Sequence, residues 1–95
     1  MNYETIFIVQ PDANQERQDE ILKEVKGILS EKKTAVLSEQ NWGKKTLAYE
    51  IKKNKEGFYY YVKFSSLVAE VPNNLSLFYR RTDAILRFMT LKLDD

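Results

Sequence analysis

The 95-residue sequence contains no cysteine and no histidine. Without cysteine, the chain cannot form disulfides, thiolate nucleophiles, Cys-ligated zinc sites or iron–sulfur clusters. Without histidine, it lacks the most common general base and the most common metal ligand. Its three glycines are too few for a glycine-rich phosphate loop. These absences predict a protein that is not an enzyme and that carries no cofactor and no metal.

Long apolar runs are also missing. No apolar stretch approaches the roughly 20 residues that a membrane-spanning helix needs, and the N-terminal residues 1–4 do not resemble a signal peptide. Hydrophobic residues make up 43% of the chain, which is enough for a folded core. We therefore expect a cytoplasmic protein that forms a single domain over residues 1–95.

The 15 basic and 14 acidic residues nearly cancel, but the basic ones are segregated. Residues 44–63 hold six lysines and two glutamates, and residues 80–92 hold three arginines and one lysine with one aspartate. If folding brings these two segments together, they form a basic patch suited to a polyanion such as RNA. Otherwise they are two solvated faces.

Apolar patterns along the chain predict the order β-α-β-β-α-β. Segments rich in β-branched and aromatic residues predict strands over residues 3–9, 34–51, 58–64 and 85–93. Apolar residues at helical spacing predict one helix that starts near Asp12 or Asn14 and a second over residues 66–80. Pro72 is compatible with the second helix if it falls in the first turn.

This order predicts a ferredoxin-like α+β sandwich. Its four-stranded antiparallel sheet has the order 4-1-3-2, and both helices cover one face. We expect a bulge or kink at Trp42-Gly43 and a cationic polar loop over residues 52–57 at the tip of a hairpin.

Side-chain alternation along the strands predicts an unusual second face of the sheet. The residues assigned to the helix side are Phe7, Val9, Tyr60, Val62, Phe64, Leu86 and Phe88. The open face then holds Lys63, Arg87 and six apolar or aromatic residues, Ile6, Ile8, Tyr59, Tyr61, Met89 and Leu91. An uncovered surface of this kind is rare on a monomer. We therefore interpret these six residues as a partner-protein surface.

Three stretches resemble the bacterial small-subunit ribosomal protein S6 family. Residues 42–51, WGKKTLAYEI, resemble that family's W-G-[RK]-[RK]-x-L-A-Y-x-I signature, and residues 57–59, GFY, resemble the start of its third strand. Residues 80–89 carry an R-x-x-D-x-[IV]-x-R-x-M pattern that is similar to its last motif. The resemblance runs in order over nearly the whole chain.

The resemblance implies a ferredoxin-like structural constituent of the small ribosomal subunit. It implies binding to the central domain of 16S ribosomal RNA together with a partner ribosomal protein, S18, and we expect a ribosome-associated chain that is a monomer when isolated. Lys44, Lys45, Arg80 and Arg87 match basic positions of the family and are predicted to bind RNA. Trp42 is either packed over the second helix or free to present an edge to RNA or protein.

The sequence departs from the family pattern at three places. Lysine stands at 44 and 45 where arginine is more common, which makes bidentate phosphate contacts less assured. Glu50 replaces a common proline. Asp94 and Asp95 form only a short acidic end compared with the longer tail of some relatives.

Three other functions are compatible with this fold. An RNA-recognition module binding single strands fits Tyr61 to Phe64, but it needs glycine or alanine at 60 and glycine at 58, where tyrosine and phenylalanine stand. A small acylphosphatase-like hydrolase would need an anion-binding loop before the first helix, where residues 11–14 read PDAN. A homo-oligomeric module would bury the open face against a second copy.

Overall fold

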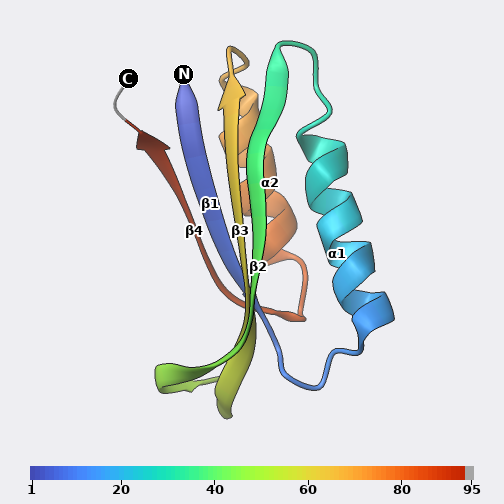
Figure 1. The fold of residues 1–95 in the computed structure, drawn as a ribbon, viewed down its shortest axis with the longest axis vertical. Helices are drawn as coiled ribbons and strands as arrows, with labels where there is room; N and C mark the ends of the chain where they lie inside the picture. Colours follow the sequence, from blue (N-terminus) through green and yellow to red (C-terminus); the bar gives the residue numbers. More distant parts are fainter. Residues whose placement is uncertain (94–95) are drawn as a thin grey trace.

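All six predicted elements are present in the computed structural model, which describes residues 1–93. They are β1 (Asn2–Val9), α1 (Gln15–Ile28), β2 (Thr34–Ile51), β3 (Asn54–Ser66), α2 (Glu70–Arg80) and β4 (Ile85–Leu93). The strands pair antiparallel in the order β2-β3-β1-β4, which is the predicted order read from the other edge. Both helices lie on the same side of the sheet (Figure 1), so the ferredoxin-like prediction is confirmed. The acidic end at 94–95 lies outside the described residues.

The helices begin where local hydrogen bonding allows. Asn14 is the N-cap of α1, and its side-chain oxygen accepts a hydrogen bond from the Arg17 amide at 2.8 Å. The second helix starts later than predicted, at Glu70, because Ser66 still pairs with β2 and its hydroxyl accepts a hydrogen bond from the Val68 amide at 3.0 Å. Pro72 falls in the first turn of α2, where no helical amide bond is lost.

The core lies between the helices and one face of the sheet. Phe7 and Tyr60 stack with their ring centroids 5.2 Å apart, and Tyr79 of α2 packs against Phe7 at 5.3 Å. The buried hydroxyls are bonded: that of Tyr79 lies 2.9 Å from Thr5 Oγ1, and that of Tyr60 donates to Gln18 Oε1 at 2.7 Å. Burial raises the pKa of Tyr79 well above its ordinary value. The predicted helix-side residues confirmed by burial are Phe7, Val9, Tyr60, Val62 and Phe64, with Phe88 half-buried against them.

The assignment of Leu86 to the helix side was wrong. The register between β1 and β4 shifts between Ile8 and Val9, which pair with Arg87 and Ile85. This bulge interrupts the alternation, so Leu86 packs on the open side against Ile8, while Ile85 joins the main core. Strict alternation along β4 could not reveal it.

The β2–β3 hairpin extends past the rest of the sheet and curls toward the face without helices (Figure 1). The predicted loop over 52–57 is shorter than expected: Lys52 and Lys53 alone form the turn, both with left-handed φ values of 47° and 66°. The predicted bulge is confirmed between Asn41 and Gly43, where Gly43 has a φ of 79°. We call residues 45–57 the hairpin arm.

Candidate functional site

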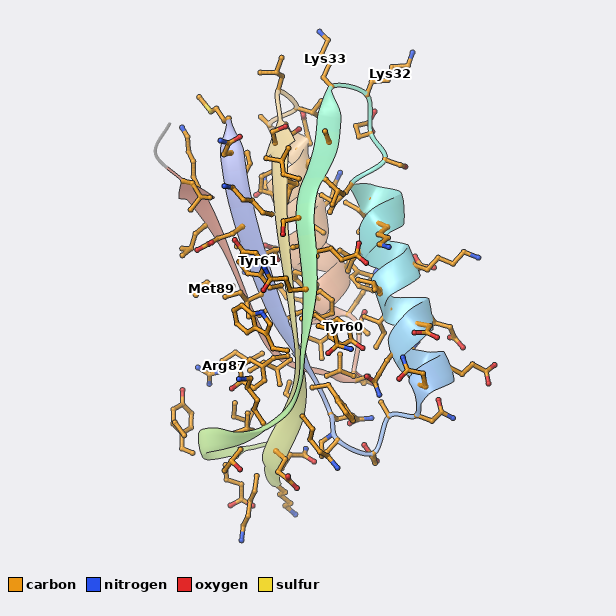
Figure 2. All side chains as sticks on the ribbon, viewed as in Figure 1. Lys32, Lys33, Tyr60, Tyr61, Arg87 and Met89 are labelled. Carbon is orange, nitrogen blue, oxygen red and sulfur yellow. The ribbon has the colours of Figure 1, made fainter. Side chains whose placement is uncertain are left out.

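The open face of the sheet carries the apolar surface predicted from the sequence. Figure 2 shows Tyr61, Met89 and Arg87 on the side away from the helices, with Tyr60 on the helix side. Met89 is 49% exposed and Leu91 42% exposed. Ile6, Tyr59 and Tyr61 are half-buried. These residues form a continuous apolar area on strands that are neighbours in the sheet.

Ile8 does not belong to the exposed part of this surface. It is 7% exposed, because Leu47 of the hairpin arm and Leu86 of β4 already cover it. Ile8 therefore adds little exposed area to this surface, and its predicted contact with a partner, through the part that lines the hollow, stays a prediction. The covering contact is long-range in sequence and follows from the curl of the arm.

Trp42 lies on the open face and not over α2. Its ring stacks on Tyr61 with centroids 5.4 Å apart, and its Nε1 donates to Gln40 Oε1 at 2.7 Å. The Tyr61 hydroxyl donates to Glu4 Oε2 at 3.1 Å. Partial burial and this hydrogen bond raise the pKa of Tyr61. Since Trp42 already covers one side of the Tyr61 ring, a base cannot stack there as it would in an RNA-recognition module.

A hollow of about 690 Å³ lies between the hairpin arm and the open face. Its apolar and aromatic lining includes Ile6, Ile8, Tyr59, Leu86 and Met89 from strands of the sheet, and Tyr79 from α2. Trp42 and three cations, Lys52, Arg80 and Arg87, line it as well. The volume falls in the range of sites that take one small ligand or a few side chains.

The cations around this hollow come from both basic segments of the sequence. Arg80 is the last residue of α2, Arg87 lies on β4, and Lys52 belongs to the hairpin turn. The Arg87 guanidinium lies 5.3 Å from the centroid of the Tyr49 ring. Within residues 1–93 none of the three is ion-paired. Folding therefore brings segments 44–63 and 80–92 together, as one of the two interpretations predicted.

Lys44 and Lys45 are exposed but lie on opposite faces of β2. Lys44 pairs with Phe58, and its Nζ lies 5.6 Å from the centroid of that ring on the helix side. Lys45 pairs with Gly57 and so has the open-face register. The two lysines therefore border the same end of the molecule without forming one cluster with Arg87.

The hairpin arm is the part of the site that sequence reasoning missed. Leu47 and Ile51 anchor it to Ile8 and Leu86, and Tyr49 reaches Arg87. The alternation of apolar and polar residues over 45–51 indicated a strand. The signal that could have revealed the fold-over is the buried Gly57, since a Cβ there would collide with Ile8 Cγ2.

Two classes of site are not found in the described part of the chain. No group of three or more acidic, histidine or cysteine side chains within residues 1–93 is placed to hold a metal ion. No helix in that range is both long enough and apolar enough to cross a membrane.

The structure thus defines a ferredoxin-like sandwich domain with an apolar open face bordered by cations. A family model described as ribosomal protein S6 matches residues 2–92. Small ribosomal subunit protein bS6 from Bacteroides thetaiotaomicron is 39% identical over 97% of this chain and 80% of that protein. The bS6 protein from Caldanaerobacter subterraneus subsp. tengcongensis is 34% identical over 99% of this chain and 98% of its own length.

A solved structure agrees with these relatives. The crystal structure of 30S ribosomal protein S6 from Thermotoga maritima matches with a TM-score of 0.85 and 33% identity, over 95% of this chain and 84% of that one. The chain belongs to the ribosomal protein S6 family, a family of small-subunit ribosomal proteins. The resemblance found in residues 42–51, 57–59 and 80–89 is thereby confirmed.

Proposed function

We propose that this chain is a non-catalytic constituent of the small ribosomal subunit, acting in the cytoplasm. It binds the central domain of 16S ribosomal RNA together with the partner ribosomal protein S18 and is a monomer when isolated. The observation that carries this proposal is the meeting of two unlike surfaces at one end of the sheet: an apolar open face and a border of cations without ion-pair partners within residues 1–93. Each surface suits a different ligand.

The RNA contacts are assigned to the cationic end. Lys44, Lys45 and Arg80 are exposed there, and neutralising phosphates releases counterions, which supplies affinity independent of sequence. Arg87 and Trp42 lie further in, on the open face, so we place them at the border between RNA and partner. Folded RNA is recognised mainly by its shape, phosphates and 2′-hydroxyls, which such scattered cations can follow.

The protein contact is assigned to the open face. Ile6, Tyr59, Tyr61, Met89 and Leu91 form its accessible part, and Ile8 lies beneath them. Covering apolar area stabilises a complex by about 25 cal/mol per Å², before association costs are subtracted. A partner with a matching apolar surface is the expected ligand.

A salt titration tests the RNA assignment. Lys44→Ala combined with Lys45→Ala should weaken binding to a 16S central-domain fragment in a filter assay. The double variant should also lower the slope of log K against log salt by about 2. Lys32→Ala with Lys33→Ala removes equal charge from the opposite end of the sheet (Figure 2). This control should keep the wild-type slope, and equal slopes for both variants would remove residues 44 and 45 from the RNA site.

A charge-insertion pair tests the protein assignment. Met89→Glu should weaken binding to S18 in calorimetry by about tenfold or more, because a charge would be buried in an apolar contact. Leu77→Glu on α2 is the matched control, since Leu77 is also an exposed apolar residue, at 59%. If Leu77→Glu weakens binding as much as Met89→Glu, the partner does not sit on the open face.

A further inference from the structure

The hollow differs from the rest of the open face in having a cation on each of two walls. Arg87 comes from β4 and Lys52 from the turn of the hairpin arm, and Arg80 at the end of α2 lines the hollow as well. On the open face, Glu4 of β1 is an acidic residue, but its carboxylate accepts a hydrogen bond from the Tyr61 hydroxyl. Among residues 1–93, no acidic side chain lines the hollow. An occupant with one negative charge would therefore meet attraction from two sides.

Arg87 is held so that its hydrogen-bonding groups can serve a ligand. Its guanidinium lies against the Tyr49 ring at 5.3 Å, and within residues 1–93 it has no carboxylate partner. Stacking occupies the flat side of a guanidinium and leaves its N–H groups at the edge. Those groups form two parallel bonds to a carboxylate or to a phosphate.

The lining between the cations decides which of these two anions fits. Ile6, Ile8, Leu86 and Met89 offer no strong hydrogen-bond donor or acceptor. Among the aromatic residues of the lining, Trp42 Nε1 and the Tyr79 hydroxyl are already hydrogen-bonded, so Tyr59 adds a single hydroxyl. A nucleobase buried there would lose most of its bonds to water without replacement, and each polar group left unpaired weakens binding. An apolar side chain loses no such bonds. The lining therefore favours a protein segment over a nucleotide.

We infer that the hollow between the hairpin arm and β4 binds a segment of the protein partner in which an apolar side chain stands next to a carboxylate, with that carboxylate on Arg87. Lys52 on the opposite wall adds to the attraction. This inference rests on the proposed protein contact of the open face and specifies its anchor. Arg87 lies at the proposed border between RNA and partner, and this inference assigns it to the contact with the partner protein.

A fragment titration tests the chemistry without the partner. The probes are 3-phenylpropionate, its neutral amide, and uridine 5′-monophosphate, each followed by methyl NMR at Met89 and Ile6. We expect saturable shifts with 3-phenylpropionate and at least about tenfold weaker binding of the amide, since hydrogen bonds to a charged group are stronger than those to a neutral one. Uridine 5′-monophosphate should also bind more weakly than 3-phenylpropionate.

Variants of Arg87 locate the anion. Arg87→Gln should reduce the affinity for 3-phenylpropionate about tenfold, and Arg87→Lys should reduce it less because the charge remains without the fork. Arg81→Gln, an exposed arginine that lines the groove between the helices, should leave it unchanged. Equal binding of acid and amide, tighter binding of the nucleotide, or no saturable shift with any probe would each overturn the inference.

Binding of the whole partner separates this inference from the proposed function. If the wild-type chain binds the partner and Arg87→Gln binds about tenfold more weakly, with Arg81→Gln unchanged, the anchor is supported. If Arg87→Gln binds the partner like wild type, the anchor is wrong and the protein contact stands. If the wild-type chain does not bind the partner, the proposed contact fails, and the fragment titration still decides the chemistry of the hollow.

Discussion

The two faces of the same sheet have opposite chemistry, although their residues alternate along the same strands. On the covered face Phe7, Tyr60 and Tyr79 pack ring against ring, and every buried hydroxyl there has a partner. On the open face Met89 and Leu91 remain accessible, with cations beside them. One face is covered by the chain's own helices, and the other stays partly exposed to solvent.

The contrast between the two faces separates stability from binding in this protein. Substitutions on the covered face should cost folding free energy, while those on the open face should cost affinity. The hairpin arm is the exception, because it buries Ile8 on the open face with the chain's own Leu47.

The sharpest contrast is between Phe7 and Met89. Phe7→Ala should lower the free energy of unfolding by about 3–5 kcal/mol, because Phe7 is fully buried and leaves a cavity. Met89→Ala should lower it by less than about 1 kcal/mol, since Met89 is half-exposed. Chemical denaturation measures both. Similar losses would show that the open face is a second core, and the milder Phe7→Leu keeps the test possible if the alanine variant does not fold.

Two glycines, Gly57 in the hairpin arm and Gly27 in α1, test how closely the arm packs against the sheet. A Cβ at Gly57 would collide with Ile8 Cγ2 and lie 3.2 Å from the Val9 carbonyl oxygen, so Gly57→Ala should destabilise by about 1–3 kcal/mol. A Cβ at Gly27 of α1 would meet nothing within 4 Å, so Gly27→Ala should stabilise by about 0.5–1 kcal/mol. Thermal unfolding of both variants should show shifts of opposite sign.

Alkaline pH probes the covered face through Tyr79. Burial raises the pKa of Tyr79, so above about pH 10 the unfolded chain releases this proton while the folded chain keeps it. Stability from this group is complete below pH 10 and falls by about 1.4 kcal/mol per pH unit above it. Between pH 10 and 12, the unfolding free energy of Tyr79→Phe should therefore fall less steeply than that of wild type, by about 1.4 kcal/mol per pH unit. An unchanged slope would mean that the hydroxyl is not protected.

Trp42 should show the smallest effect on stability. It is 41% exposed and its stack on Tyr61 lies on the open face, so Trp42→Ala should cost about 1 kcal/mol or less. The same variant should weaken S18 binding measurably in calorimetry. If Trp42→Ala costs several kcal/mol of stability and leaves binding unchanged, Trp42 stabilises the fold and does not contact the partner.

Local patterns in the sequence determined the elements, the sheet order and the covered core. Helical spacing, strand alternation and caps depend on neighbours a few residues apart, and Asn14, Gly43 and Phe7 behave as those rules predict. The same alternation identified which side chains of β1 and β3 remain on the open face. The family resemblance was also contained in short motifs.

Only the tertiary structure decided how that open face is shaped. The bulge that moves Leu86, the two-residue turn at Lys52 and Lys53, and the curl of the hairpin arm onto Ile8 depend on pairing and packing between distant segments. Strand periodicity assigns a residue to a face but carries no information about where a strand bends or which distant chain covers it. The hollow, and the grouping of cations around it, therefore form only when the chain folds.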